Sequence, residues 1–485
     1  MTDQVLPYNS KWLLRVYLAI VFFSTIVCII TGSYLAFFAP LVLLYLVTFS
    51  LSWKLAYWML LFSIPFSVLF TLQGDTLSIS LPDEPMMWAF LLLLPVLFAN
   101  KPGIIYKWWL KDPLVIVVLL QLIWLFVAVL HSRVFFLSAK FLVAKVWYLA
   151  CFFVFPIWVF RNKKDFKKGF WLMLASMLAT VVVVLFRQLH AHFSFITINR
   201  DIGALYNNHV EYSSVLSMFL PLVFIAYLIC PPRKKWIKRA LLAITLVFLI
   251  AVFFSYARAA VLAVIFSAIV GLAIRFRLVN VIMPCIYGII TLLMVYLVQD
   301  SNYIDLRPDY EHTYMHTNFK GHILATFKGQ DMSSMERIYR WIAAIRMSRD
   351  EPVLGYGPHS FYYYYKPYTV NTFKTYVSEN YEHSTTHNYF LYMLVEQGWP
   401  AMILYALLVM LVFAHAQRTY HMAGDRFYKY VTLGLAMAFA ASFVNNFFSE
   451  LIETHKVGAL FYLSIALLII LRKKCKDVNM VANIR

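Results

Sequence analysis

The chain has 485 residues, of which 62% are hydrophobic and only 13% are charged. In soluble domains about a quarter of the residues are charged, so this composition excludes an ordinary soluble protein and predicts an integral membrane protein. In a soluble chain a formal net charge of +19 would indicate nucleic-acid binding. Whether it does so here depends on how the charged residues are distributed along the chain.

Apolar runs long enough to form membrane-spanning helices recur along almost the whole sequence. Several are short and closely joined, so we expect about 12 to 14 spans in an all-α polytopic integral membrane protein. The first run follows a head without a small-residue cleavage site, which predicts a retained span rather than a signal peptide. The runs cover residues 12–30, 34–51, 55–72, 85–99, 113–130, 141–160, 168–186, 210–230, 239–256, 258–274, 279–298, 389–413, 427–447 and 456–471.

The basic residues follow the positive-inside rule. With the N-terminus inside, most of the 42 Lys and Arg residues but few of the 23 acids fall in inner segments, including clusters at 161–168, 233–239 and 472–485. The excess of positive charge is therefore a topology signal, and we expect no nucleic-acid partner. The same distribution predicts an even number of spans, both termini in the cytoplasm and a large outer loop over residues 299–388.

Four of the five cysteines fall in predicted spans, and Cys475 lies in the inner tail. Because no predicted outer loop contains a cysteine, we expect no structural disulfide there. The sequence contains neither a CxxC pair nor an HExxH helix, so we expect no zinc site.

Two outer loops carry cations whose role the sequence leaves open. Arg133, Lys140 and Lys145 lie at the mouth of the sixth predicted span, where they either snorkel to lipid phosphates or line an anionic substrate site. In a longer outer loop, Arg200 either pairs with the adjacent Asp201 or reaches a phosphate held at the membrane surface.

The ninth and tenth predicted spans meet at residues 255–260, SYARAA, which leaves no room for a loop. Arg258 therefore lies at or just inside the outer membrane boundary, two residues after Tyr256, and its charge needs a partner. No acidic residue lies nearby in the sequence. The pattern favours an anionic ligand for Arg258 over a solvated surface charge.

The segment over residues 299–388 is the only predicted extramembrane piece large enough to shape a site. Residues 333–336, SSME, read as a capping box that begins a helix ending before Pro352. An apolar stripe at helical spacing predicts that this helix lies along the outer membrane-water interface. The stripe is Ile338, Trp341, Ile342 and Ile345, and Arg337, Arg340, Arg346 and Arg349 lie off it. The aromatic run at 361–365, FYYYY, fits a membrane interface and also fits stacking on sugar rings.

At the end of this loop, His387 and Asn388 lead directly into the apolar run that begins at residue 389. His387 is either a base acting on a substrate at the membrane surface or, with Asn388, a cap where the helix enters the bilayer. Its position alone favours the cap. Glu396 follows about two and a half helical turns later, on roughly the opposite side of the helix, which predicts a structural role.

These pieces together resemble the signature of the O-antigen ligase and polymerase superfamily, over roughly residues 200 to 410. The His387-Asn388 pair followed by Glu396-x-Gly398 is similar to the family's His-Asn pair and Glu-x-Gly. Pro400 stands where a second glycine is usual in the family. The other matching pieces, in order, are Arg200 in an outer loop, Ser255 to Arg258, Arg337 with Trp341, and Pro352 with the Gly-Tyr-Gly of residues 355–357.

The resemblance implies a GT-C-like glycosyltransferase of the bacterial inner membrane, without a metal or other cofactor and with its active site facing the periplasm. It implies inverting transfer of a glycan from undecaprenyl diphosphate to an acceptor, among membrane lipids. The residues themselves allow this chemistry, because an acceptor hydroxyl needs a base and a departing diphosphate needs cations. The implied roles are His387 as the base, Arg258, Arg200 and Arg337 on the diphosphate, and Asn388 and Tyr256 as supporting residues.

The acceptor stays open in the sequence. A ligase uses lipid A-core, a polymerase uses another lipid-linked repeat of the growing glycan, and a related branch uses a protein serine or threonine. A flippase for lipid-linked oligosaccharides, from a different class, would line its cations through the depth of the membrane. We expect four parts of the chain: spans at 1–298, a periplasmic loop at 299–388, spans at 389–471, and a basic cytoplasmic tail at 472–485.

Overall fold

The computed structural model describes residues 19–24, 26–27, 38–71, 78–100, 103, 106–306, 332–370 and 385–484. The chain divides into two compact units, residues 1–63 and 64–485. The first unit contains α2 (Phe38–Leu51) and α3 (Trp53–Ser63), which pack against each other. The predicted span over residues 12–30 falls largely outside the described residues.

The prediction of a span over residues 55–72 is wrong. Helix α3 ends at Ser63, a 3-10 turn follows (η2, Ile64–Phe66), and the chain then forms strand β1 (Val68–Thr71). Strand β1 pairs antiparallel with β2 (Ser78–Leu81). Pro65 explains the change, because it has no N–H for a helical hydrogen bond and disfavours the helical conformation of the residue before it.

Eleven helices in the described part of the second unit are long and apolar enough to cross a membrane, which confirms an all-α polytopic membrane protein. They coincide with the last eleven predicted runs. The helices are α4 (Asp83–Asn100), α6 (Pro113–His131), α7 (Phe135–Leu149) continued by η3 (Ala150–Val154) and α8 (Pro156–Val159), α9 (Lys163–His190), α11 (His209–Ile229), α12 (Lys235–Phe254), α13 (Arg258–Arg275), α14 (Val279–Val298), α18 (Tyr389–Met422), α19 (Arg426–Phe447) and α20 (His455–Ile484).

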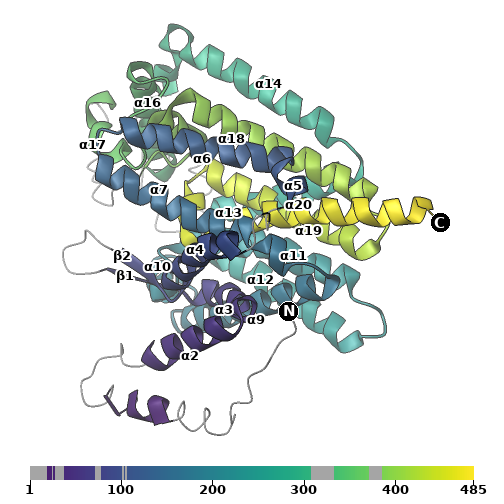
Figure 1. Cartoon of the computed structure of the whole chain (residues 1–485). Coiled ribbons are helices and arrows are strands. Elements are labelled where there is room, and N and C mark those ends of the chain that lie inside the picture. The colour runs from purple at the N-terminus through teal and green to yellow at the C-terminus, as the bar shows by residue number, and fades with distance from the viewer. Residues whose placement is uncertain are drawn as a thin grey trace. The chain divides into compact units, whose positions relative to one another are not determined.

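Successive spans place their connections on alternate sides of the second unit. One side, here named the loop-rich side, carries the β1–β2 hairpin and the described segments 132–134, 191–208, 255–257, 299–306, 332–370, 385–388 and 448–454. Figure 1 shows the hairpin, α10 (Ile198–Ile202), α16 (Met332–Asp350) and α17 (Phe361–Tyr364) at this end, opposite the C-terminal end of α20. The predicted basic clusters all fall on the other side, together with the short α5 (Lys107–Leu110).

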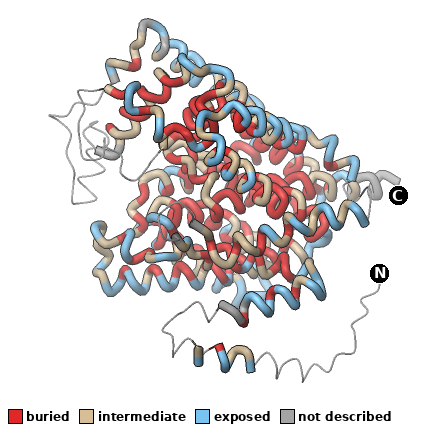
Figure 2. The backbone as a smooth tube through the Cα atoms, turned by 60° about the vertical axis from the view of Figure 1, so that its left-hand side comes forward, coloured by how far each residue is buried: buried red, intermediate tan, exposed pale blue. Residues whose placement is uncertain are grey.

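The centre of the second unit is built by α11, α19 and α20. Helix α19 packs against α11, α13, α18 and α20. In the 18-residue apolar stretch of α20, 94% of the residues are buried, whereas the share in α14 is 11%. Helix α14 is therefore a peripheral helix with a lipid-facing surface. Figure 2 shows the same arrangement, with buried residues gathered at the centre of the helices and exposed ones along the periphery.

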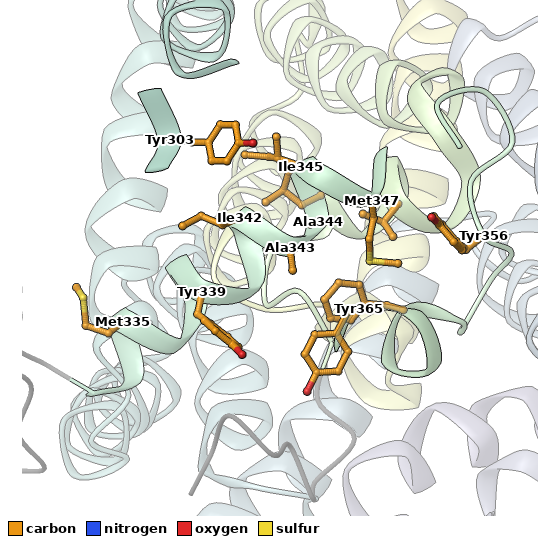
Figure 3. Packing of buried hydrophobic residues seen from close by; sticks show 13 residues of the cluster. Tyr303, Met335, Tyr339, Ile342, Ala343, Ala344, Ile345, Met347, Tyr356 and Tyr365 are labelled. Carbon is orange, nitrogen blue, oxygen red and sulfur yellow. The ribbon is translucent and has the colours of Figure 1, made fainter. Parts of the chain in front are cut away.

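The described part of the 299–388 loop folds around helix α16. Helix α16 includes Met332, one residue before the predicted capping box, and ends before Pro352 as predicted; it packs against α18, η5 (Gln299–Leu306) and η6 (Lys366–Tyr368). Ile342 and Ile345 of the predicted stripe are buried in a cluster with Tyr303, Tyr356 and Val395, part of which Figure 3 shows. The apolar stripe therefore packs against other parts of the protein.

The aromatic run at 361–365 mostly belongs to the same cluster. Phe361 and Tyr365 are 0% and 1% exposed, and their rings stack at a centroid distance of 5.0 Å. Tyr363 alone among the five is exposed. The run is therefore chiefly the core of the loop, a role that the sequence analysis did not include among its alternatives.

Candidate functional site

The segment 385–388 forms a tight loop that presents His387. His387 has a φ of 50°, in the left-handed region that residues other than glycine rarely adopt. The indole N–H of Trp341 donates to the carbonyl of Thr386 (3.0 Å), and the hydroxyl of Thr386 donates to the carbonyl of Asn388 (2.9 Å). Such backbone outliers persist only where their surroundings hold them, and they concentrate at functional sites.

Asn388 is the N-cap of α18, as one of the two sequence interpretations proposed. Its side-chain oxygen accepts from the N–H groups of Phe390 (3.0 Å) and Leu391 (3.1 Å), and its amide donates to the carbonyl of Phe447 (3.1 Å) at the end of α19. The side chain thus fixes the start of one span to the end of another. Because Asn388 makes these capping bonds, the imidazole of His387 is not needed as a cap.

Three charged groups surround the imidazole of His387. Oε2 of Glu450 lies 3.8 Å from Nδ1, and Arg340 and Arg337 of α16 act on the ring electrostatically. Burial, with help from the two arginines, holds the pKa of His387 well below its usual range. Burial also raises the pKa of Glu450. At neutral pH the imidazole is therefore uncharged, which is the form that accepts a proton.

Arg340 is a member of this site that the sequence analysis did not select. Its side chain is 3% exposed, and Nη1 has no hydrogen-bond partner among the described residues. A buried guanidinium with an unused donor carries an energetic cost unless a ligand or water completes it. The sequence around Arg340 gave no signal of this role, because the residues on which its charge acts, His387 and Glu450, are far from it along the chain.

The structure brings one of the three predicted arginines, Arg337, to His387. Arg200 lies in α10, is 77% exposed and makes a 3.8 Å ion pair with Asp201. Arg258 is the first residue of α13, a helix that packs along α19. Both belong to the loop-rich side, as does His387.

Tyr256 connects two loops of the loop-rich side. Its φ is 56°, and its hydroxyl donates to the carbonyl of Phe193 in the 191–208 segment. Its ring lies edge-on to Phe195 at 5.4 Å. The residue therefore joins the turn that precedes Arg258 to the loop that contains Arg200.

The Gly-Tyr-Gly stretch and the Glu-x-Gly stretch bind to each other. Helix α18 kinks at Gly398, whose φ is 77°, and Pro400 has no N–H to donate to the carbonyl of Glu396. The N–H groups of Tyr356 and Gly357 donate instead to the carbonyls of Val395 (2.9 Å) and Glu396 (3.0 Å). The loop thus replaces the helical hydrogen bonds that the kink removes.

Glu396 has the structural role that its position predicts. Its carboxylate is fully buried and accepts from the backbone N–H groups of His359 (2.6 Å) and Phe361 (3.3 Å). A Cβ on Gly355, at a φ of 65°, would lie 2.5 Å from the carbonyl oxygen of Val395, so only glycine permits this close approach. The two motifs together place the 352–361 segment against α18.

The segment 450–456, ELIETHK, is a connecting element that sequence reasoning missed. After Glu450, Glu453 accepts from Nζ of Lys145 (2.6 and 2.8 Å) and from the hydroxyl of Tyr389 (2.5 Å). Next, His455 lies 3.9 Å from Asp83, and Lys456 donates to the carbonyl of Pro65 (3.2 Å) and to that of Leu205. The signal in the sequence is the group of ionisable residues directly before an apolar span.

Lys145 and Arg133 differ from both interpretations of their loop. Lys145 is 8% exposed and paired with Glu453, so it neither snorkels to lipid nor faces an anionic substrate. Arg133 makes a 2.6 Å ion pair with Glu351 and lies over the ring of Tyr356 at 4.8 Å. Both cations hold elements of the loop-rich side together.

The Lys145→Met variant should be strongly destabilised, because it leaves the Glu453 carboxylate buried without its partner cation. We expect a loss of about 3–5 kcal/mol, and we expect Lys145→Met with Glu453→Leu to recover most of it. Thermal unfolding of the purified protein measures both. The matched control is Lys163→Met, which breaks an exposed ion pair with Asp425 and should cost less than about 1 kcal/mol. Equal effects of the two single variants would contradict this account.

Within the described residues, no group of three or more His, Cys, Asp or Glu side chains is arranged to hold a metal ion. The site contains instead an uncharged imidazole, two guanidinium groups and a carboxylate. Such a set can accept a proton from a hydroxyl and bind an anion nearby.

The fold and the site define a polytopic α-helical membrane protein with a histidine-centred candidate site on one side of its spans. Residues 242–406 match the model of a family described as O-Antigen ligase. This confirms the predicted resemblance, and this part of the chain is a domain of the O-antigen ligase superfamily. The matched residues include Arg258, Arg337, Arg340 and His387, but neither Arg200 nor Glu450. No curated protein matches the chain.

Proposed function

We propose that this protein is a glycosyltransferase that moves a glycan from undecaprenyl diphosphate to a hydroxyl of lipid A-core at the periplasmic face of the bacterial inner membrane. The transfer is inverting and needs no metal. The observation that carries the proposal is the imidazole of His387, held 3.8 Å from Glu450 and beside Arg337 and Arg340, within a domain of the O-antigen ligase superfamily.

In this mechanism His387 accepts the proton of the acceptor hydroxyl while its oxygen attacks the anomeric carbon of the donor. The bond from that carbon to the diphosphate breaks, and the electron pair leaves with the diphosphate. Arg337, Arg258 and Arg200 are the cations that stabilise the departing charge. Asn388 and Tyr256 support them by holding the loops that carry His387 and Arg258.

A polymerase of the same superfamily is the alternative within this chemistry, since it would use the same base and cations and differ only in its acceptor. The arrangement of charges favours either enzyme over a flippase. Arg337 and Arg340 lie beside His387 on the loop-rich side, and the buried Asp83, Glu211 and Lys456 lie in the first turn of their helices on that side, whereas Lys145, Glu396 and His415 are buried further along theirs.

The proposal is tested by deleting the gene, complementing with the wild-type gene, and separating surface polysaccharide and lipid-linked intermediates on gels. Full-length chains left on the carrier beside bare core, restored by complementation, are the result expected of a ligase. Core that carries a single repeat would assign a polymerase instead. Repeats retained on the cytoplasmic leaflet would overturn the enzyme and assign a flippase.

The Arg258→Lys variant should bind a lipid-linked diphosphate donor roughly tenfold more weakly, because an ammonium group cannot reproduce the two-pronged contact of a guanidinium. Binding of undecaprenyl diphosphate to the purified protein measures this effect. Arg275→Lys, at the other end of the same helix, is the matched control and should bind normally. Unchanged binding by Arg258→Lys would remove Arg258 from the diphosphate site.

A further inference from the structure

The end of α19 and the start of α18 are joined so that Glu450 faces His387. Nδ2 of Asn388 donates to the carbonyl of Phe447, three residues before Glu450. On the other side of the site, the indole of Trp341 holds the carbonyl of Thr386. These two bonds fix the backbone on both sides of the His387–Glu450 pair, whose Nδ1 and Oε2 atoms lie 3.8 Å apart.

Burial raises the pKa of Glu450, and neighbouring groups partly offset that shift. The hydroxyl of Thr385, the side chains of Arg340 and Arg337, and the backbone N–H of His387 all favour its ionised form against the burial that opposes it. Oε2 has no hydrogen-bond partner among the described residues, so it keeps the capacity to accept from the imidazole. The pair is 28% and 21% exposed, which leaves the imidazole accessible.

A carboxylate beside one nitrogen of an imidazole holds the ring proton on that nitrogen and leaves the lone pair on the other. Here the carboxylate faces Nδ1. We propose that Glu450 is the positioning residue of His387: it keeps the proton on Nδ1, directs Nε2 as the base toward the acceptor hydroxyl, and stabilises the imidazolium that forms. This proposal rests on the proposed function, in which His387 is the base.

The proton balance is simple in this arrangement. The acceptor O–H bond breaks and its proton goes to Nε2, the new bond forms from that oxygen to the anomeric carbon, and the electron pair of the broken bond leaves on the diphosphate. The positive charge gained by the imidazole then lies next to the carboxylate of Glu450. The proton later passes from Nε2 to solvent or to the diphosphate, and Glu450 undergoes no covalent change.

Arg340 and Glu450 act on the same ring with opposite charges. The described charged groups that act on it are Arg340 and Arg337 from α16 and Glu450 from the segment after α19. Removing the carboxylate lowers the pKa of His387 further, whereas removing a guanidinium raises it. A general loss of structure would not shift the pKa of His387 in opposite directions when Glu450 and Arg340 are replaced.

The experiment measures modification of His387 by diethyl pyrocarbonate, which attacks the neutral imidazole, as a function of pH. Labelling is quantified by peptide mass spectrometry on the full-length protein in nanodiscs. Relative to the wild type, the labelling midpoint should move to lower pH in Glu450→Gln and to higher pH in Arg340→Gln. Glu450→Gln should also lower the rate of glycan transfer by about 10²-fold or more, and Glu450→Asp should recover part of that loss.

The matched control is Glu453→Gln, which removes a carboxylate from the same segment but from the contact with Lys145. It should lower the unfolding temperature and leave the labelling midpoint of His387 unchanged. An unchanged midpoint and unchanged turnover in Glu450→Gln would overturn the positioning role. If Glu450→Gln does not fold, the test uses Arg340→Gln and Glu450→Asp instead. The positioning role is overturned if both variants show the labelling midpoint and the transfer rate of the wild type.

Failure of this inference is distinguishable from failure of the proposed function. Labelling reports the environment of His387 without any turnover, so the shifts occur even if the protein catalyses nothing. If His387→Ala retains full transfer, the proposed function falls, whatever the labelling shows. If His387→Ala is inactive and Glu450→Gln behaves as the wild type, only the positioning role falls.

Discussion

Replacing His387 with alanine should abolish glycan transfer while the protein remains folded in the membrane. The imidazole is the base of the proposed reaction, and loss of a positioned base typically lowers a rate by about 10²–10⁴-fold. The structural cost should be small, because the side chain is 28% exposed and α18 is capped by Asn388 rather than by His387. Transfer to the acceptor and the yield of membrane-inserted protein are measured together.

Two further variants separate the base from the backbone at this position. His387→Asn removes the imidazole but tolerates a φ of 50°, so it should be as inactive as His387→Ala and at least as stable. Asn388→Ala removes the cap, which should cost about 0.5–2 kcal/mol of stability and leave substantial transfer. Substantial turnover by His387→Asn would sink the assignment of the base.

The pH dependence of the wild type follows from the same residue. Because burial and two arginines lower the pKa of His387, the neutral form persists below pH 6.5, and transfer should fall only as the pH drops through that lowered value. The unfolded chain binds a proton near pH 6.5, where the folded site does not. The contribution of the neutral His387 to the free energy of unfolding is therefore complete above pH 6.5, and it decreases as the pH falls toward the pKa of His387 in the folded protein.

The second large effect is expected for Gly398→Ala, at the kink of α18. The new Cβ would overlap the carbonyl of Val353, and the φ of 77° is itself strained for alanine. The neighbouring backbone has little room to move, because the N–H of Trp399 donates to the carbonyl of Pro352 (2.9 Å). We expect a loss of more than about 4 kcal/mol, which is exceptional for a single substitution.

Thermal unfolding and the yield of monodisperse protein in detergent measure this loss. Gly288→Ala is the control, because a Cβ at that helical position meets open space and should leave the unfolding temperature unchanged or slightly higher. Transfer by the surviving Gly398→Ala protein should also be low, since the kink holds the loop that precedes His387. An unfolding temperature equal to that of the wild type would show that the kink tolerates a side chain.

The sequence by itself determined the class of protein and most of its spans. Run length and charge distribution are local properties, because a helix in lipid must satisfy its own backbone and span the apolar layer. For the same reason the C-terminal end of α16 and the cap at Asn388 were predictable, since both are read from a few adjacent residues. The failure at residues 55–72 occurred where apolar content continued past Pro65 but helical hydrogen bonding did not.

Only the tertiary structure decided which charges meet. Lys145 and Glu453 are 308 positions apart, and Glu450 reaches His387 from the connecting segment after α19, so no local pattern relates them. The apolar stripe of α16 shows the same limit, because its spacing predicts an apolar partner without saying whether that partner is lipid or protein. Burial of a charge depends on all elements that pack around it, and that information arises when distant segments of the chain come together.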